Sequence, residues 1–373
     1  MLADKVLVIV GTRPEVIKMA PVVRAMRARP ESFRVELCVV GQQTAILDRA
    51  LAEWELEPQV RIDPAGPFKG PSARLAAMLG PLEAAVQASA PRLVLVHGDT
   101  TTTLAGTLAA TYSGRDVAHV EAGLRSGDPR CPFPEEMHRT LVDRMAAVLY
   151  APTPTARDHL IRDGCDPGRI VVVGNTVVDA IEAVCRRPPT EAPTRWGGRR
   201  MILVTGHRRE SFGSGLVGVC RAIRRLVLER DDIQVVYVLH PHPEAHQPTQ
   251  RLLSGVRGVE LLPPLGYRDF VTLMRQAYLI VTDSGGIQEE APYLGKPVLV
   301  TREQTERPEA VRDGVARMVG LQPGAIVQNV RQLLDDREAH AAMARRTNPF
   351  GRPGASGRIC DNLARRLLWS RAS

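Results

Sequence analysis

Residues 282–297, TDSGGIQEEAPYLGKP, place a hydroxyl, two glycines and two carboxylates between two apolar runs. Gly285 and Gly286 allow backbone N–H groups to approach an anion closely, and Ser284 can cap a helix that begins there. The dipole of such a helix favours a phosphate at its start. Glu290 follows about one turn later, where a carboxylate can accept hydrogen bonds from ribose hydroxyls. The stretch therefore suits a nucleoside diphosphate, or it is a tight strand–helix turn whose acids balance the dipole.

Two cations follow the first apolar run, in the sequence GTRPEVIK. Thr12 and Glu15 have the spacing of a capping box, and Pro14 fits the first turn of a helix. Helix initiation explains these three residues. It does not explain Arg13 and Lys18, which we expect at the carboxyl edge of the first strand, where both could reach an anion.

Three segments of the first half bring acids to strand ends or loops. Asp99 lies in VHGDTTTTLAG, Glu121 in HVEAGLRSGD, and Glu135 beside Glu136 in PFPEEMHR. The threonines after Asp99 also suit a helix cap. A single acid of this kind is usually a solvated loop charge. Several acids that converge would raise one another's pKa values by repulsion and serve as proton donors and acceptors near neutral pH.

The second half opens with TGHRRESFG, in which His207 and two arginines follow a strand and suit phosphate charge. TERPE supplies Arg307 after the strand that follows the glycine pair, unless this segment is only a surface loop. His240 and His242 lie close together in HPHPEA. No further Cys or His has the spacing of a metal ligand, so we expect no metal site and instead hydrogen-bonding or solvent-facing histidines.

The elements that must position these residues alternate in type. Short, continuously apolar runs, as expected of parallel strands covered on both faces, are separated by longer helical patterns. We expect strands over residues 5–10, 34–40, 92–97, 116–121, 147–151, 169–174, 201–205, 234–239, 258–262, 278–282 and 297–301, and a helix over 359–371. A Pro- and Arg-rich segment, 186–200, interrupts the alternation as a linker or surface loop. The pattern predicts two doubly wound α/β domains, with ligands at the strand carboxyl ends and in the cleft between the domains.

Composition excludes several classes of protein. The 373 residues are 44% hydrophobic and 24% charged, with a formal net charge of +8, and nearly all of the basic residues are arginine. No dense basic run with interleaved aromatics suggests nucleic-acid binding. The N-terminal run VLVIV is too short for a signal peptide, and no later segment is long enough to span a membrane. Six cysteines without a Cys-x-x-Cys pair suit buried thiols in a reducing cytoplasm.

The motifs together resemble those of the non-hydrolysing UDP-N-acetylglucosamine (UDP-GlcNAc) 2-epimerases, from about residue 5 to the C-terminus. The segments that carry the resemblance are GTRPEVIKMAP, VHGDTTTTLAG, HVEAGLRSGD, PFPEE, TGHRRESFG, TDSGGIQEEAPYLGKPVLV and TERPEAV. The resemblance implies the glycosyltransferase B fold, with two Rossmann-like domains. Residues 1–172, completed by helix 359–373, would carry the catalytic carboxylates, and residues 173–358 would bind UDP. It also implies a homodimer.

This family interconverts UDP-GlcNAc and UDP-N-acetylmannosamine (UDP-ManNAc) without a metal or nicotinamide cofactor. UDP is eliminated to leave 2-acetamidoglucal and then adds back, with protonation from the opposite face of C2. The resemblance implies acid–base and sugar-contact roles for Asp99, Glu121 and Glu135, with His207 beside the diphosphate. It implies substrate contacts from Arg13, Lys18, Ser284, Gly285 and Gly286 (phosphates), Glu290 (ribose), Arg307 (sugar or diphosphate), Arg139 and Phe270.

The sequence departs from the family pattern at two places. Bacterial members often carry Gln-His-Arg-Glu after the second strand, in a neighbouring site where UDP-GlcNAc acts as an activator. Here only Gln42 is kept, and Gln43, Thr44 and Ala45 replace the rest, so we expect this activation to be weakened or lost. His138 replaces the family's asparagine after PFPEE.

Two other activities fit the same scaffold. A hydrolysing epimerase would release UDP and free N-acetylmannosamine, and a glycosyltransferase with a UDP-sugar donor would require an acceptor. A nucleotide-sugar sensor is a third, non-catalytic alternative. The pathway stays open between a cell-surface polymer and a specialised metabolite such as an aminosugar antibiotic.

Overall fold

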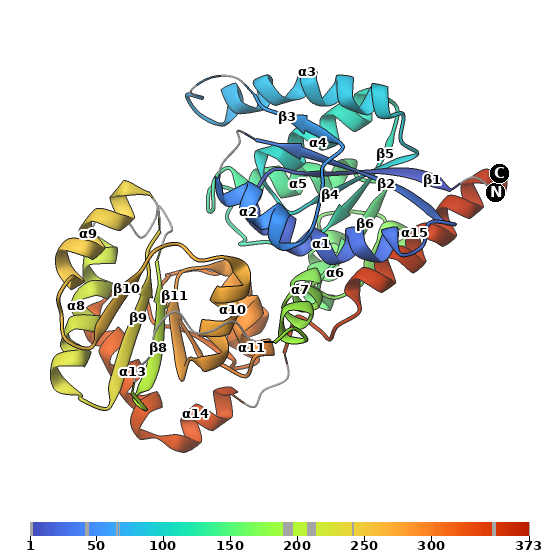
Figure 1. Cartoon of the computed structure of the whole chain (residues 1–373). Helices are drawn as coiled ribbons and strands as arrows, with labels where there is room; N and C mark the ends of the chain where they lie inside the picture. Colours follow the sequence, from blue (N-terminus) through green and yellow to red (C-terminus); the bar gives the residue numbers. More distant parts are fainter. Residues whose placement is uncertain are drawn as a thin grey trace. The chain divides into compact units, whose positions relative to one another are not determined.

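The computed structural model describes residues 3–41, 45–64, 66, 68–188, 197–206, 214–240, 242–344 and 348–372. The chain forms two compact units (Figure 1). Unit 1 contains Met1–Ala183 and Phe350–Ser373, and unit 2 contains Val184–Pro349. Each unit has a parallel sheet flanked by helices, which confirms the predicted pair of doubly wound α/β domains.

The sheet of unit 1 has seven parallel strands in the order β3-β2-β1-β4-β5-β6-β7. The order reverses between β1 and β4, which is where ligands of doubly wound sheets bind. The strands are β1 Asp4–Val10, β2 Phe33–Val40, β3 Val60–Ile62, β4 Leu93–His97, β5 Asp116–Val120, β6 Val148–Ala151 and β7 Ile170–Val172.

Helices cover both faces of this sheet. In Figure 1, α3, α4 and α5 lie on one face, and α1 and α15 lie on the other. The helices of unit 1 are α1 Arg13–Arg27, α2 Ala45–Glu53, α3 Pro71–Ser89, α4 Thr101–Tyr112, α5 Glu135–Met145, α6 Pro154–Arg162, α7 Thr176–Cys185, which crosses the unit boundary, and α15 Ala355–Ala372. A 3-10 turn spans Pro167–Arg169.

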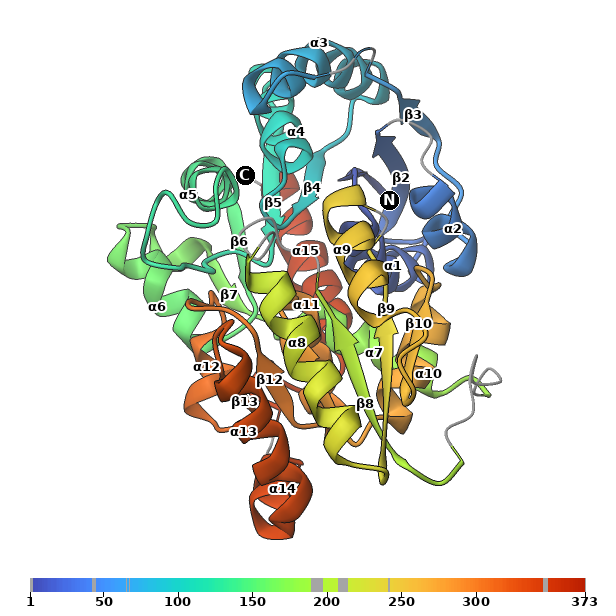
Figure 2. The same cartoon turned by 90° about the vertical axis from the view of Figure 1, so that its left-hand side faces the viewer.

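Unit 2 repeats the plan with six parallel strands in the order β10-β9-β8-β11-β12-β13. They are β8 Arg200–Thr205, β9 Ile233–Val238, β10 Val259–Leu262, β11 Leu279–Thr282, β12 Val298–Val300 and β13 Ala316–Met318. Its helices are α8 Ser214–Glu229, α9 Pro243–Leu253, α10 Tyr267–Gln276, α11 Gly285–Tyr293, α12 Pro308–Arg312, α13 Pro323–Asp335 and α14 Arg337–Ala344. Figures 1 and 2 show α8 and α9 on one face of the sheet and α11 on the other.

The central strands are buried on both faces, as their continuous apolar sequence predicts. Every residue of β4, β9 and β11 is buried. The core of each unit is mainly aliphatic, with Tyr150 and Tyr237 as its largest fully buried side chains. The strands therefore form a rigid support whose carboxyl ends present the loops.

The unit boundaries differ from those expected from the sequence. They fall at 183/184 and 349/350, whereas the sequence placed them at 172/173 and 358/359. The Asp179 carboxylate of α7 accepts a hydrogen bond from the backbone N–H of Ser356 at 2.6 Å, and the N–H of Asn175 donates to the carbonyl of Phe350 at 3.1 Å. These bonds hold α7 and the start of α15 together in unit 1. Part of the predicted loop, residues 189–196, lies outside the described residues.

Cys38, Cys165, Cys220 and Cys360 are buried free thiols, as predicted, whereas Cys131 and Cys185 are partly exposed. Burial raises the pKa of the Cys38 thiol to about 12, so that this thiol is inert at neutral pH.

Across the part of the chain that the structure describes, no helix is both long and apolar enough to cross a membrane.

Gly123 provides a test of the backbone in the turn after β5. Its φ is 86°, and a Cβ built there would lie 2.3 Å from the Ala156 carbonyl oxygen. We expect Gly123→Ala to cost about 1–2 kcal/mol for the left-handed backbone and about 1–3 kcal/mol more for overpacking. Urea unfolding measures this free-energy change.

Gly127 is the matched control, because its φ is 85° and nothing lies within 4 Å of a Cβ built at that position. Gly127→Ala carries only the backbone strain. Equal loss of unfolding free energy in the two variants would contradict the close contact at Gly123.

Candidate active site

The candidate acids of unit 1 follow neighbouring strands. Asp99 follows β4 and Glu121 follows β5, and β4 pairs with both β1 and β5. Arg13 begins α1 directly after β1 and is partly exposed. Because parallel strands end at the same edge, these side chains gather at the predicted ligand-binding edge of the sheet.

Glu15 joins the turn after β1 to the turn after β4. Its carboxylate accepts hydrogen bonds from the backbone N–H groups of Gly11 at 2.6 Å and Thr12 at 2.7 Å, which agrees with the predicted capping box. It also accepts hydrogen bonds from the hydroxyls of Thr100 at 2.6 Å and Thr103 at 3.2 Å. Glu15 is therefore a structural acid, since it holds the start of α1 against the start of α4.

Glu121 lies between two basic side chains. Nζ of Lys18, which is 5% exposed, contacts Oε2 of Glu121, and Nε2 of His97 is 3.6 Å from the same oxygen. Neither ring nitrogen of His97 has a hydrogen-bond partner among the described residues. The sequence predicts a phosphate contact for Lys18, and that prediction stays untested beside this ion pair. His97, which ends β4, was not predicted as a neighbour of Glu121, which follows β5.

The backbone of Glu121 is unusual as well. Its φ is 70°, in the left-handed region that residues other than glycine rarely adopt. The N–H groups of Glu121 and Ala122 both donate to the Tyr150 carbonyl at 3.1 Å. Strain of this kind clusters at functional sites and persists only where the surrounding structure enforces it.

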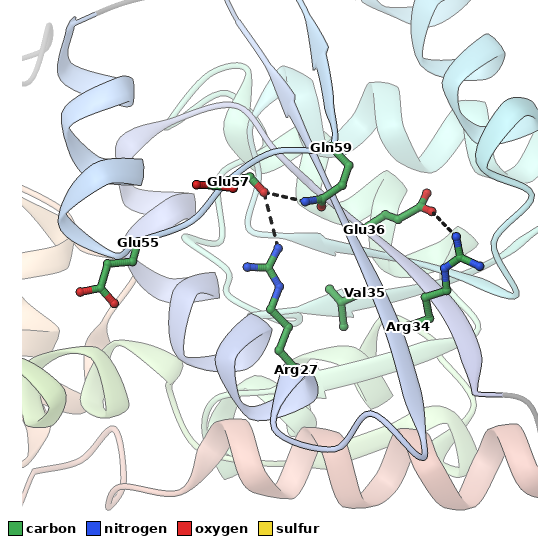
Figure 3. Close-up of a pocket in the computed structure, with 7 residues that line it drawn as sticks. All are labelled: Arg27, Arg34, Val35, Glu36, Glu55, Glu57 and Gln59. Carbon is green, nitrogen blue, oxygen red and sulfur yellow. Dashed lines mark hydrogen bonds and ion pairs between the residues drawn. The ribbon is translucent and has the colours of Figure 1, made fainter.

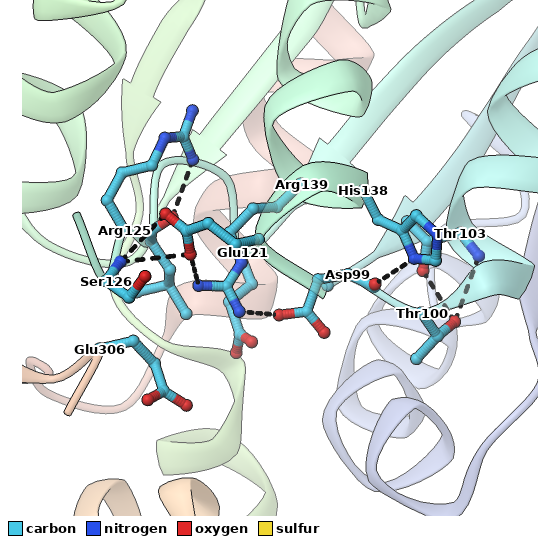
Figure 4. A network of polar contacts seen from close by, with 12 residues as sticks. Asp99, Thr100, Thr103, Glu121, Arg125, Ser126, His138, Arg139 and Glu306 are labelled. Atoms are coloured by element: carbon cyan, nitrogen blue, oxygen red, sulfur yellow. Dashed lines mark hydrogen bonds and ion pairs between the residues drawn. The ribbon is translucent and has the colours of Figure 1, made fainter. Parts of the chain in front are cut away.

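Asp99 also has a cation against it (Figure 4). Arg139, on α5 and 3% exposed, contacts the Asp99 carboxylate and bonds Glu136 at 2.8 Å. His138 Nδ1 lies 3.0 Å from the Asp99 backbone carbonyl, so this nitrogen must donate. The residue that replaces the family's asparagine therefore supports the backbone of Asp99. Glu135 is partly exposed at the first position of α5.

The cations change the electrostatics expected from the sequence. Lys18 and Arg139 each contact one of the two carboxylates Glu121 and Asp99. The spacing of the sequence predicts the acids but not these basic partners, which come from α1 and α5.

In unit 2, the start of α11 lies against a cation. Ser284 occupies the N-cap position, as predicted, but its hydroxyl forms no capping hydrogen bond. A Cβ built at Gly285 would lie 2.6 Å from a terminal nitrogen of Arg307, so only glycine leaves room for this guanidinium. Arg307 and the N–H groups at the helix start both favour an anion at the same place.

Arg307 is held by acids on both sides. Its Nε bonds Oε1 of Glu289 at 2.8 Å, and its terminal nitrogen contacts Glu306. Glu306 is also bonded by Arg302 at 2.9 Å. All four side chains are less than 9% exposed. This buried network fixes the position of the guanidinium, because leaving any of these charges without its partner would be costly.

The remaining predicted contacts of unit 2 have different settings. Glu290 is 8% exposed and lies just past the middle of α11, and Phe270 is partly exposed on α10. Their substrate contacts stay predictions. His207, together with Gln42, Gln43 and Thr44, lies outside the described residues.

The histidines in HPHPEA make local hydrogen bonds. Nδ1 of His240 accepts from the backbone N–H of His242 at 3.1 Å, and Nδ1 of His242 caps α9 by accepting from Glu244 at 3.3 Å. Within the described ranges, no three His, Cys, Asp or Glu side chains are grouped so as to hold a metal ion.

A polar hollow of about 400 Å³ lies elsewhere on unit 1 (Figure 3). Its lining residues are Arg27, Arg34, Val35, Glu36, Glu55, Glu57 and Gln59. Three of these are at the start of β2, whereas the candidate acids follow strand ends. The hollow is therefore separate from the candidate active site.

A family model described as UDP-N-acetylglucosamine 2-epimerase matches residues 24–364. A curated UDP-N-acetylglucosamine 2-epimerase from Escherichia coli (strain K12) is 44% identical over 369 residues, which cover 96% of this chain and 98% of that protein. The chain belongs to the UDP-N-acetylglucosamine 2-epimerase family. It is thus an enzyme of the isomerase class.

Two solved structures show the same fold. The Neisseria meningitidis UDP-GlcNAc 2-epimerase bound to UDP-GlcNAc has a TM-score of 0.94 and 36% identity, covering 97% of this chain and 100% of that one. The Staphylococcus aureus MnaA–UDP co-structure has a TM-score of 0.89 and 38% identity, covering 98% of this chain and 97% of that one.

Proposed function

We propose that this epimerase interconverts UDP-GlcNAc and UDP-ManNAc without net hydrolysis. The observation that carries the proposal is the placement of Asp99 and Glu121 at adjacent strand ends, each against a buried cation. The guanidinium of Arg307 at the start of α11 supports diphosphate binding by unit 2. The ligands of the Neisseria and Staphylococcus proteins support the same substrate class.

The proposed reaction avoids a free carbanion at C2. That carbon bears no carbonyl group, so its proton is not acidic. A base removes the proton, the released electron pair forms the C1–C2 double bond, and the C1–O bond breaks as UDP leaves with its electrons. Protonation of 2-acetamidoglucal on the other face of C2 then accompanies attack of a UDP oxygen at C1. One base, one acid and a stabilised diphosphate are sufficient for this path.

The residues divide these tasks between the units. Asp99, Glu121 and Glu135 would supply acid–base chemistry and sugar contacts. Lys18, which pairs with Glu121, would contact the phosphates. His207 would lie beside the diphosphate. The other proposed contacts are Arg13, Arg139, Ser284, Gly285, Gly286, Arg307 (phosphates or sugar), Glu290 (ribose) and Phe270.

NMR of UDP-GlcNAc with the enzyme in heavy water tests the reaction class. We expect UDP-ManNAc to form. Both UDP-GlcNAc and UDP-ManNAc should acquire deuterium at C2, because the protons of the catalytic acid and base exchange with the solvent. Accumulation of free UDP with N-acetylmannosamine would indicate the hydrolysing reaction. Consumption of the UDP-sugar only when an acceptor is added would indicate a glycosyltransferase.

Amide substitutions test the proposed carboxylates. Asp99→Asn, Glu121→Gln and Glu135→Gln should each lower turnover by about a hundredfold to ten-thousandfold, the usual range for acid–base catalysis. UDP affinity, measured by calorimetry, should survive because none of these three carboxylates is a proposed diphosphate contact. Asp158→Asn is the control, since this exposed acid on α6 pairs with the adjacent Arg157. Normal turnover in all three site variants would refute the assignment.

Gly285→Ala tests the diphosphate seat. The new methyl group would displace the Arg307 guanidinium, and loss of one charge-assisted contact is worth about 1.5–3 kcal/mol. We therefore expect the Kd for UDP in calorimetry to rise by about tenfold to a hundredfold.

Gly324→Ala provides the comparison, because Gly324 also lies in the first turn of a unit 2 helix, and nothing lies within 4 Å of a Cβ built there. Its Kd should match that of the wild type. An unchanged Kd for Gly285→Ala would show that Arg307 does not bind the nucleotide.

We also propose that activation by UDP-GlcNAc is weak or lost, because Gln43, Thr44 and Ala45 replace the family's polar, basic and acidic residues. Initial rates should then depend hyperbolically on UDP-GlcNAc, and UDP-ManNAc alone should be converted. A strongly sigmoidal dependence of the rate on UDP-GlcNAc would contradict this proposal. So would a failure to convert UDP-ManNAc unless UDP-GlcNAc is also present.

The remaining expectations concern the enzyme's setting. The free thiols support a reducing cytoplasm as its location. The family resemblance supports a homodimer.

A further inference from the structure

A buried histidine–aspartate pair links β5 to α5 in unit 1. His119 lies in β5, Asp143 lies near the end of α5, and both side chains are 0% exposed. Nδ1 of His119 is 2.7 Å from Oδ1 of Asp143, and Nε2 is 2.7 Å from the carbonyl oxygen of Gly98. Neither side chain is among the proposed substrate contacts. A charged pair buried so completely is costly unless its polar atoms are satisfied, so its partners indicate its role.

Both ring nitrogens of His119 face acceptors. Burial raises the pKa of the Asp143 carboxyl, but the charge and hydrogen bond of His119, followed by those of Arg125, outweigh burial and leave the pKa below its ordinary value. Asp143 is therefore ionised at neutral pH. A carboxylate and a backbone carbonyl can only accept, so both nitrogens of His119 donate.

The second oxygen of Asp143 holds the turn that carries Glu121. Oδ2 accepts a hydrogen bond from the backbone N–H of Gly123 at 3.2 Å and forms an ion pair with Arg125 at 2.8 Å. The carboxylate thus restrains the backbone just after Glu121. The strained φ of Glu121 requires such restraint, because an isolated turn would relax to a commoner conformation.

The other end of the pair holds the turn that carries Asp99. The carbonyl bonded by His119 belongs to Gly98, the residue immediately before Asp99. A continuous path therefore runs from this carbonyl through His119 and Asp143 to the turn after β5. One rigid pair fixes the backbone at both strand ends.

We propose that His119 and Asp143 are positioning residues that set the separation of Asp99 and Glu121 without touching the substrate. The proposal rests on the proposed catalytic roles of Asp99 and Glu121. Catalytic groups displaced by about 1 Å lose about a hundredfold in rate, so the path should affect turnover more than binding.

Three variants separate the hydrogen-bond path from its charge. In Asp143→Asn, the amide nitrogen donates to Nδ1 of a neutral His119, and the amide oxygen accepts from Gly123, so the path survives. In His119→Phe, a slightly larger aromatic ring remains but both hydrogen bonds are lost. Asp163→Asn is the matched control, because Asp163 bonds Arg125 at 2.8 Å outside the path.

The measurements are kcat and KM for UDP-GlcNAc, with near-UV circular dichroism to establish folding. We expect kcat of His119→Phe to fall by about a hundredfold while KM changes by less than about threefold. Asp143→Asn and Asp163→Asn should keep kcat within about threefold of the wild type. A normal kcat for His119→Phe, or an Asp143→Asn variant as impaired as His119→Phe, would overturn the proposal.

If His119→Phe does not fold, His119→Gln replaces it. The glutamine amide has a single donor nitrogen, whereas the histidine ring has two that bond Asp143 and the Gly98 carbonyl. The amide cannot replace both bonds, so the same loss of kcat is expected. Failure of the wild type to epimerise UDP-GlcNAc would contradict the proposed function itself. A wild type that loses activity through Asp99→Asn but not through either His119 substitution would contradict only the positioning role.

Discussion

A carboxylate removed from water must find a cation or several hydrogen-bond donors, or its burial becomes costly. This constraint shapes the carboxyl edge of the sheet in unit 1. Glu121 contacts Lys18, and Asp99 contacts Arg139. Glu15 meets the same requirement with backbone N–H groups and threonine hydroxyls, and in doing so it holds two helix starts together. The acids therefore remain ordered at strand ends, where solvent would otherwise be their main partner.

In unit 2 the buried charge is a cation, and its partners are carboxylates. The guanidinium of Arg307 is fixed by Glu289 and Glu306 and packs against Gly285 at the start of α11. A cation that is already oriented needs little reorganisation when an anion arrives, which is how oriented charges stabilise a leaving diphosphate. The glycine is as necessary as the charge, since any larger residue would occupy the place of the guanidinium.

Much of the fold could be predicted because apolar β-branched runs report buried strands directly. The strands β3 and β13 were missed because each has three residues with an arginine at its centre. The site was predicted less completely, since its ion pairs join distant residues: Lys18 and Glu121 are 103 positions apart. No sequence motif predicts the pair of His119 and Asp143, because the two residues lie on a strand and on a helix and come into contact only in the folded unit.

The placement of α15 affects how the nascent chain can fold. The ribosome makes residues 355–372 after all of unit 2, yet α15 packs against α1 near the start of the chain. Ile359 and Leu363 of this helix are fully buried. Unit 2 is continuous in sequence and can be completed during translation, whereas the earlier-made unit must keep an apolar face uncovered until its last helix emerges. The interval between these events is the period in which a chaperone or a second nascent chain would find a binding surface.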